Sequence, residues 1–167
     1  MGQSAWGDRD MTTTYAGGCA CDAVRYEATA KPLFVHCCHY RRCQRQNGSA
    51  FALNAMIEAS CVRKLQGELE VIDTPSESGR GQKVHRCVVC KTAVWSVYGG
   101  AGPKIFFLRV GSLDDPTAMP PDVHIFTDSK QPWVALPTGV PAVPAFYDRK
   151  ALWPAESLDR LKQALTT

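Results

Sequence analysis

The sequence predicts a mainly β fold with one short helix at its C-terminal end. Three observations carry this prediction. Short segments alternate apolar and polar residues with a period of two, as half-buried strands do. Clusters of Gly, Pro and Ser separate these segments. The last segment instead repeats Leu158, Leu161 and Leu165 at helical spacing behind Pro154, which is well suited to the first position of a helix.

The expected strands lie, in chain order, within residues 15–29, 33–37, 51–57, 68–73, 83–86, 93–98, 105–110 and 123–126. The polar and basic stretch 38–48 interrupts this pattern, so we expect it to be an inserted loop or one helical turn. Residues 132–144 contain four prolines, which cannot donate hydrogen bonds to a sheet. We therefore expect an extended, irregular strap there.

Composition favours one domain, because 167 residues with 45% hydrophobic content suit a single core. Residues 1–13 are polar and unpatterned, so we expect a flexible tail followed by a single domain over residues 14–167. Asp8 and Arg9 lie where a secretory signal needs apolar residues, which predicts a cytoplasmic protein. The longest aliphatic and aromatic run, Ile105–Leu108, is far shorter than the about 20 residues of a membrane span. A net charge of +3 is too small to indicate nucleic-acid binding.

Eight cysteines in a chain without an export signal point to metal binding or catalysis rather than to disulfides. Cys19 and Cys21 are separated by one residue, and Cys87 and Cys90 by two. Two such turns brought together supply the four sulfurs of a closed, structural zinc site. The alternative is that these are small buried residues or a redox dithiol.

A second group lies in His36–Cys43. If the start of this stretch is extended, Cys37 and Cys38 point to opposite faces, so only one of them readily joins Cys43 on a metal. We assign Cys38 to this role. Two sulfurs with His39 or water give a site with an open position, which is typical of catalytic zinc. Alternatively, Cys38 packs, His39 hydrogen-bonds and no metal binds.

The remaining candidates receive no catalytic role. Cys61 is expected in a strand, His85 to orient the nearby Cys87 as a metal ligand, and His124 to be a core histidine. Arg41, Arg42 and Arg45 either attract carboxylates, such as those of a small peptide, or form a solvated face.

Five motifs in this order form a recognisable set: Gly17–Cys21 with Val24–Tyr26, Cys38–Cys43 with Gly48–Phe51, Cys87–Cys90, Val110–Pro116 and His124–Phe126. In them the sequence resembles the glutathione-dependent formaldehyde-activating enzyme family, which includes relatives of centromere protein V. The resemblance runs from about Tyr15 to Trp133.

The resemblance implies a β-tent fold of short antiparallel strands with one zinc bound by Cys19, Cys21, Cys87 and Cys90. It also implies a second zinc in a Cys-His-Cys-x-x-Cys loop, with Cys38 and Cys43 at the reactive site. The implied activity is that of a carbon–sulfur lyase of the S-hydroxymethylglutathione synthase type. Its partners would be glutathione, or a related thiol, and formaldehyde or another small aldehyde. An open zinc site lowers the pKa of a thiol or acts as a Lewis acid on a carbonyl oxygen.

The sequence departs from the family pattern at Tyr40, which replaces the middle cysteine of that loop. A phenol with a pKa of about 10 is a poorer zinc ligand than a thiol with a pKa of about 8.5. The alternative function is therefore a zinc-stabilised binding or scaffold module whose second metal site is lost. Asp22 and Lys91 stand where the family has Gly. If the backbone there has positive φ, each costs on the order of 1 kcal/mol.

Overall fold

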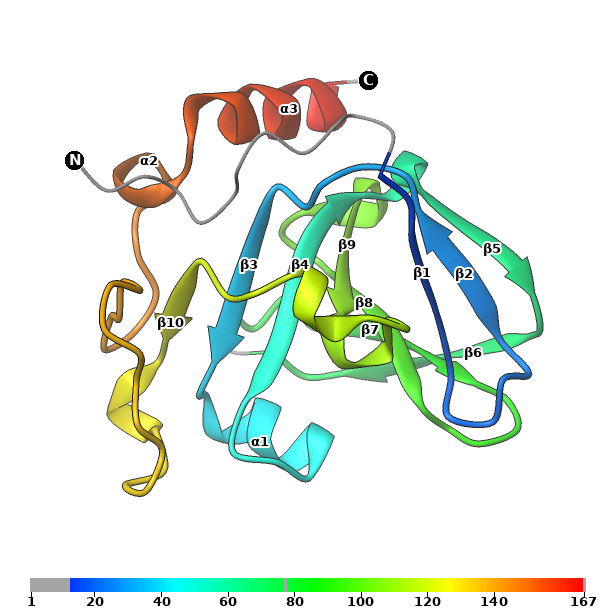
Figure 1. The fold of residues 1–167 in the computed structure, drawn as a ribbon, viewed down its shortest axis with the longest axis horizontal. Helices are drawn as coiled ribbons and strands as arrows, with labels where there is room; N and C mark the ends of the chain where they lie inside the picture. The colour runs from blue at the N-terminus through cyan, green and yellow to red at the C-terminus, as the bar shows by residue number, and fades with distance from the viewer. Residues whose placement is uncertain (1–12, 77, 167) are drawn as a thin grey trace.

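The computed structural model describes residues 13–76 and 78–166 (Figure 1). The strands in this part of the chain are β1 (Tyr15–Gly18), β2 (Arg25–Ala28), β3 (Phe34–Cys38), β4 (Ala52–Glu58), β5 (Val62–Gln66), β6 (Leu69–Thr74), β7 (Gln82–Cys87), β8 (Ala93–Tyr98), β9 (Ile105–Arg109) and β10 (Val123–Ile125). The α-helices are α1 (Arg41–Asn47), α2 (Arg149–Leu152) and α3 (Ala155–Thr166). The short 3-10 helices are η1 (Ala59–Cys61), η2 (Gly102–Lys104), η3 (Val110–Ser112), η4 (Pro116–Ala118) and η5 (Thr127–Ser129).

The strands form two sheets. One is three-stranded and antiparallel, in the order β1-β2-β5, and the other has seven strands in the order β10-β3-β4-β9-β8-β7-β6. In the larger sheet β10 pairs with β3 in parallel, and the other neighbours are antiparallel. The prediction of a mainly β fold with a short C-terminal helix is confirmed. The tail expected over residues 1–13 lies, apart from residue 13, outside the described residues.

One hydrophobic core joins the two sheets. Tyr26 of the small sheet meets Trp95 of the large sheet edge-on, with ring centroids 5.7 Å apart. Tyr26 is fully buried, as are Val35 and Leu108 of the large sheet. Fully burying such an apolar side chain contributes about 1.5–3 kcal/mol. This core holds the β1–β2 turn of one sheet at a fixed distance from the β7–β8 turn of the other.

A second core lies on the opposite face of β3, where α2 and α3 pack (Figure 1). Phe34 stacks on Trp153 with centroids 5.1 Å apart, and Leu161 of α3 is buried beside them. Arg160 anchors α3 by an ion pair with the mostly buried Glu58, at 2.8 Å. The expected C-terminal helix is present, but it begins at Ala155, so Pro154 directly precedes its first position.

Two elements differ from the expectation. Residues 38–48 contain a seven-residue helix, α1, with no apolar stripe. It is held instead by Gln44, whose side-chain amide donates to the carbonyls of His39 (2.6 Å) and Ser129 (2.9 Å). β5 was not expected, since it is mostly exposed and lies at the edge of the small sheet. Residues 132–144 form turns and one isolated bridge, as expected of an irregular strap.

Candidate functional site

Four cysteines converge where the two sheets meet. Cys19 and Cys21 come from the β1–β2 turn, Cys87 from the end of β7 and Cys90 from the β7–β8 turn. Their four Sγ atoms all lie within 4.8 Å of one another. The Sγ atoms of Cys19 and Cys21 are 3.5 Å apart, and those of Cys21 and Cys87 are 3.9 Å apart. Four sulfurs at about 2.3 Å from a tetrahedral zinc stand about 3.8 Å apart, so the donor set fits that metal.

The two turns that carry these cysteines are built alike. The Cys19 amide donates to the Val24 carbonyl at 3.1 Å, and the Cys87 amide donates to the Thr92 carbonyl at 3.0 Å. A backbone amide also donates to the first sulfur of each turn, at 3.3 Å in both cases, from Val24 and from Val89. Hydrogen bonds of this kind favour the thiolate, which is the form that binds metal.

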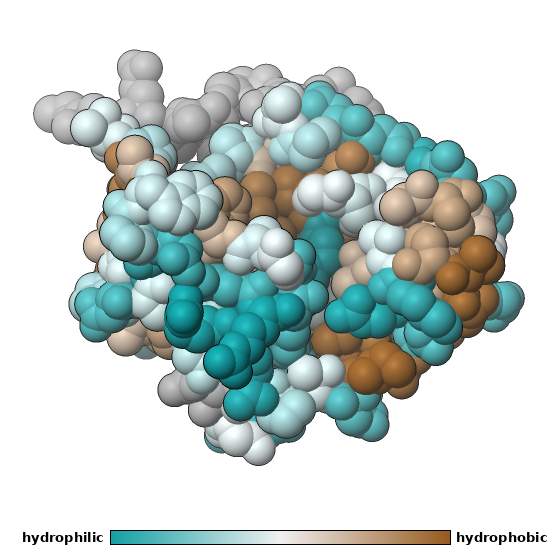
Figure 2. Space-filling view, turned by 90° about the horizontal axis from the view of Figure 1, so that it is seen from below, coloured by the Kyte–Doolittle hydropathy of each residue, from teal (hydrophilic) through white to brown (hydrophobic). Residues whose placement is uncertain are grey.

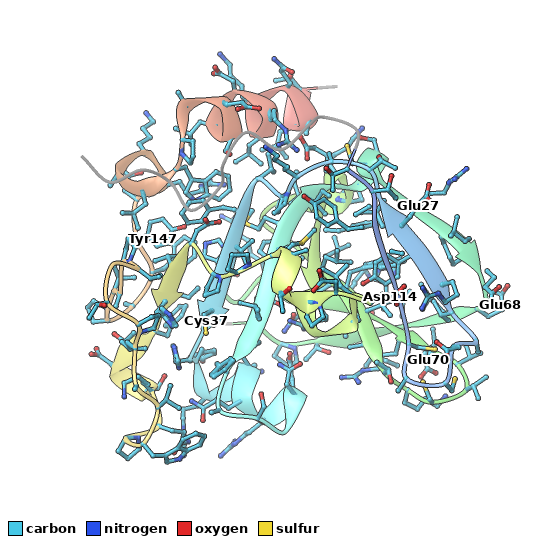
Figure 3. All side chains as sticks on the ribbon, in the orientation of Figure 1. Glu27, Cys37, Glu68, Glu70, Asp114 and Tyr147 are labelled. Atoms are coloured by element: carbon cyan, nitrogen blue, oxygen red, sulfur yellow. The ribbon has the colours of Figure 1, made fainter. Side chains whose placement is uncertain are left out.

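The residue after each cysteine pair adopts the left-handed conformation. Asp22 has φ of 58° and Lys91 has φ of 62°. The positive φ that the missing glycines suggested is therefore present in both turns. Beside the second turn, hydrogen bonding to Thr92 lowers the pKa of Cys90 to about 5. The Lys91 ammonium pairs with Glu70 of β6, labelled in Figure 3, at 3.1 Å.

Cys38 and Cys43 form a second, separate pair. Cys38 ends β3 and Cys43 lies in α1, and their Sγ atoms are 3.6 Å apart in a buried position. The hydrogen bond that Cys38 donates lowers the pKa of Cys43, and the positive charges of Arg109 and Arg42 act in the same direction. The pKa of Cys38 moves upward for the same reason. Any negative charge on the pair therefore resides on Cys43.

Arg109 is a buried cation next to this pair. Its guanidinium donates to Oδ1 of Asn54 and, at 2.9 Å, to Oγ of Ser96. Both partners are neutral, and among the described residues no carboxylate forms an ion pair with Arg109. Its charge is therefore free to act on Cys43.

A cavity of about 510 Å³ opens beside α1, which we call the α1-side cavity. Its lining includes two arginines, Arg86 and Arg109, and two apolar side chains, Phe51 and Leu53. Figure 2 views the molecule from this side, where the surface is largely hydrophilic and is hollowed near its centre. A larger cavity of about 800 Å³ lies between the β6–β7 and β8–β9 hairpins and has no cysteine or histidine in its lining.

His39 lies on the other face of β3 from the Cys38–Cys43 pair. Its Nε2 is 3.0 Å from Nδ1 of His124 and 3.7 Å from Sγ of Cys37, which is labelled in Figure 3. Burial lowers the pKa of His39 to about 4 and raises that of Cys37 to about 12. The group of possible ligands that includes His39 thus contains Cys37 and His124.

A family model described as "Glutathione-dependent formaldehyde-activating enzyme" matches residues 14–129, well over half of the chain. The chain belongs to this family. Membership supports, at the level of the family, a function of the glutathione-dependent formaldehyde-activating type. No curated protein matches the chain. A solved structure titled as a crystal structure of a Rhodobacter sphaeroides protein is 21% identical, covers 62% of this chain and 93% of that chain, and has a TM-score of 0.47.

In this family member the structure distributes the predicted residues over three places. The four-cysteine set is together, Cys38 and Cys43 are together, and His39 is apart from them. The ring of Tyr40 packs against Phe126 with centroids 5.2 Å apart. Within the described residues, no helix is both long and apolar enough to cross a membrane.

The arginines that face the α1-side cavity are not the predicted ones. Its lining includes Arg86 and Arg109, whereas Arg41, Arg42 and Arg45 of α1 are absent from it. Cys37 and His124 were also not predicted to form a group with His39. The two-residue spacing of Cys37 and His39 was a usable signal, because it places both on one face of an extended segment. Cys61 and His85 lie outside both groups of possible ligands, and the His85 ring packs on Trp95.

Proposed function

We propose that this protein catalyses the reversible addition of glutathione, or a related small thiol, to formaldehyde or another small aldehyde. The product is S-hydroxymethylglutathione or its analogue, and the reverse reaction makes the enzyme a carbon–sulfur lyase. The observation that carries the proposal is the buried Cys38–Cys43 pair beside the buried cation Arg109, which itself lines the α1-side cavity.

Both sulfur groups suit zinc as the cofactor. The set of Cys19, Cys21, Cys87 and Cys90 is closed and therefore structural, whereas Cys38 and Cys43 offer two sulfurs and leave further positions for water or substrate. When bound by that pair, zinc would lower the pKa of a thiol or polarise an aldehyde oxygen. The eight free cysteines also support our proposal of a reducing, cytoplasmic environment.

The α1-side cavity supplies binding and orientation. Its volume of about 510 Å³ lies in the usual range for small-ligand sites. Glutathione carries carboxylates, and the guanidinium groups of Arg86 and Arg109 are suited to bind them. Phe51 and Leu53 provide an apolar wall against which the uncharged parts of the substrates can pack.

In this proposal Cys43, which is buried beside Arg109 and does not itself line the cavity, handles the proton of the reaction. In the forward direction its Sγ takes the proton from the incoming thiol, whose sulfur then forms a bond to the aldehyde carbon. The carbonyl π electrons move to the oxygen, which takes the proton back from Cys43. The positive charge of Arg109 favours the thiolate of Cys43 that this role needs.

The test is the exchange of formaldehyde between its free and glutathione-bound forms, measured by NMR with and without protein. We expect the protein to accelerate the exchange, and Cys43→Ser to abolish the acceleration while the circular dichroism spectrum stays that of the wild type. Cys61→Ser, which alters a cysteine outside all of these groups, is the matched control and should remain active. An exchange rate equal to that of the uncatalysed reaction refutes the proposal.

A zinc-stabilised binding or scaffold module is the second candidate. Tyr40 favours it, because the phenol replaces a thiol ligand in the loop before α1 and its ring packs against Phe126. In that case Cys90→Ser unfolds the chain, whereas Cys38→Ser and Cys43→Ser leave both stability and zinc content unchanged. A large loss of stability in Cys38→Ser counts against this candidate.

A further inference from the structure

Cys37, His39 and His124 converge because of the pairing of β3 with β10. Cys37 and His39 are two residues apart on an extended segment, so their side chains share one face. His124 lies directly beside Cys37 in the parallel register, and the His39 amide donates to the carbonyl of Ile125 at 2.9 Å. We propose that these three side chains form a zinc site with an open fourth position, separate from both sulfur sites.

The distances between the ligand atoms match the requirements of zinc. Bond lengths of about 2.0–2.1 Å to nitrogen and about 2.3 Å to sulfur give tetrahedral edges of about 3.3 Å between two nitrogens and about 3.5 Å between nitrogen and sulfur. The observed separations are 3.0 Å between Nε2 of His39 and Nδ1 of His124, and 3.7 Å between Sγ of Cys37 and Nε2 of His39. The ligand atoms of Cys37 and His124 are no more than 4.8 Å apart. Small shifts of these side chains would complete the tetrahedral geometry.

The three side chains of this site are deeply buried, so their ligand atoms need partners within the protein. The three residues are 2%, 0% and 5% exposed. Polar groups buried this deeply cost free energy unless they are satisfied. Three metal bonds compensate for the desolvation of the inner nitrogens and the sulfur far better than their weak mutual contacts do.

The donor set also selects the class of metal and of fourth ligand. Two imidazoles and one thiolate suit zinc and its neighbours among the late transition metals, and a coordinating thiol is deprotonated by the metal. One thiolate against a divalent cation leaves a net charge of +1, so the open position favours an anion such as hydroxide or a thiolate. Phe51, which lines the α1-side cavity, packs edge-on against His39 with centroids 5.6 Å apart. The site is therefore one side chain away from that cavity.

The four histidines of the chain provide a direct test in the wild-type protein. Protein labelled with ¹⁵N in its histidine rings is first loaded with one equivalent of zinc to fill the four-cysteine set. A second equivalent is then titrated while the ring resonances are followed. We expect the signals of His39 and His124 to shift and those of His36 and His85 to stay, because neither sulfur site contains a histidine. Unchanged His39 and His124 signals up to two further equivalents overturn the proposal.

Zinc content in variants gives a second readout that separates this site from the proposed enzyme activity. His124→Ala and Cys37→Ser should each bind one equivalent less than wild type, and Cys61→Ser should bind the same amount. Cys43→Ser should lose the exchange activity but keep the histidine shifts. Wild-type zinc content in folded His124→Ala contradicts the site. If that variant does not fold, the histidine titration of the wild type decides.

Discussion

Asp22 and Lys91 occupy equivalent left-handed positions in two turns that belong to different sheets. Each directly follows the second cysteine of its pair, and each donates its amide to the carbonyl of the first cysteine, at 3.1 Å and 3.0 Å. The four-cysteine set is thus assembled from two copies of one local structure. A metal held between them would fix the small sheet to the large one at the end remote from α3.

Replacing Lys91 with glycine should relieve the strain of positive φ. The left-handed conformation costs an L-residue about 1–2 kcal/mol. Glycine avoids this cost, but part of the gain is lost because the unfolded glycine chain has more conformational freedom. The ion pair between Lys91 and Glu70 is largely solvent-exposed and contributes little. We expect Lys91→Gly to be more stable than Lys91→Ala by about 1 kcal/mol in urea denaturation. The alanine variant is the matched control, because it loses the same ion pair but keeps the strained Cβ. Equal stabilities of the two variants would show that the turn carries no strain there.

Removal of one sulfur from the four-cysteine set should unfold the domain. Structural zinc sites contribute on the order of 10 kcal/mol to folding, which is comparable to the whole stability of a domain. We therefore expect Cys90→Ser to lose its cooperative urea transition, and the wild type to lose it when a strong chelator is added. Cys61→Ser is the control and should retain the transition. A cooperative, chelator-resistant transition in Cys90→Ser would show that the fold does not depend on metal.

Asn54 should be required to keep Arg109 in place. Asn54 is buried and its side-chain oxygen accepts a hydrogen bond from the guanidinium. Hydrogen bonds to charged groups contribute about 1.5–3 kcal/mol, so Asn54→Ala should destabilise the protein by about 2 kcal/mol. Asn54→Asp keeps the acceptor and should fold, but its negative charge competes with Cys43 for Arg109. We expect this variant to slow the thiol–formaldehyde exchange, as measured by NMR. A folded Asn54→Asp variant with the exchange rate of the wild type would show that the charge of Arg109 does not contribute to the reaction.

The strands could be predicted where one face is buried and the other is not. Residues 25–28 show this alternation, because Tyr26 and Ala28 are buried and Arg25 and Glu27 are only half-buried, and β2 has those bounds. β5 was not predicted, because Arg63, Lys64 and Gln66 are exposed on the edge strand of the small sheet. A strand exposed in this way does not need alternating apolar residues. The two cysteine pairs were visible as local spacings, whereas the partnership of Cys37 with His124 depends on a parallel pairing between segments 87 residues apart. Sequence spacing cannot show such a contact, because it is created by the order of strands in the sheet.

Stability should fall between neutral pH and pH 5 because of His36. This imidazole is 3% exposed, packs against Phe34 and Phe146, and its Nε2 lies 2.7 Å from the Tyr147 hydroxyl. Burial lowers its pKa to about 4. In the unfolded chain the histidine has a pKa of about 6.5. Between the two pKa values this side chain is therefore protonated in the unfolded state and neutral in the folded state.

The contribution is complete above about pH 6.5 and is lost as the pH falls toward 4, which amounts to about 2 kcal/mol between pH 7 and pH 5. His36→Gln cannot titrate and can still hydrogen-bond to Tyr147. Urea denaturation at the two pH values should show a loss that is smaller by about 2 kcal/mol in His36→Gln than in the wild type. Because both proteins carry the same cysteines, any release of zinc at the lower pH affects them equally and cancels in the comparison. The same pH dependence in both proteins would mean that His36 is able to take up a proton in the folded state.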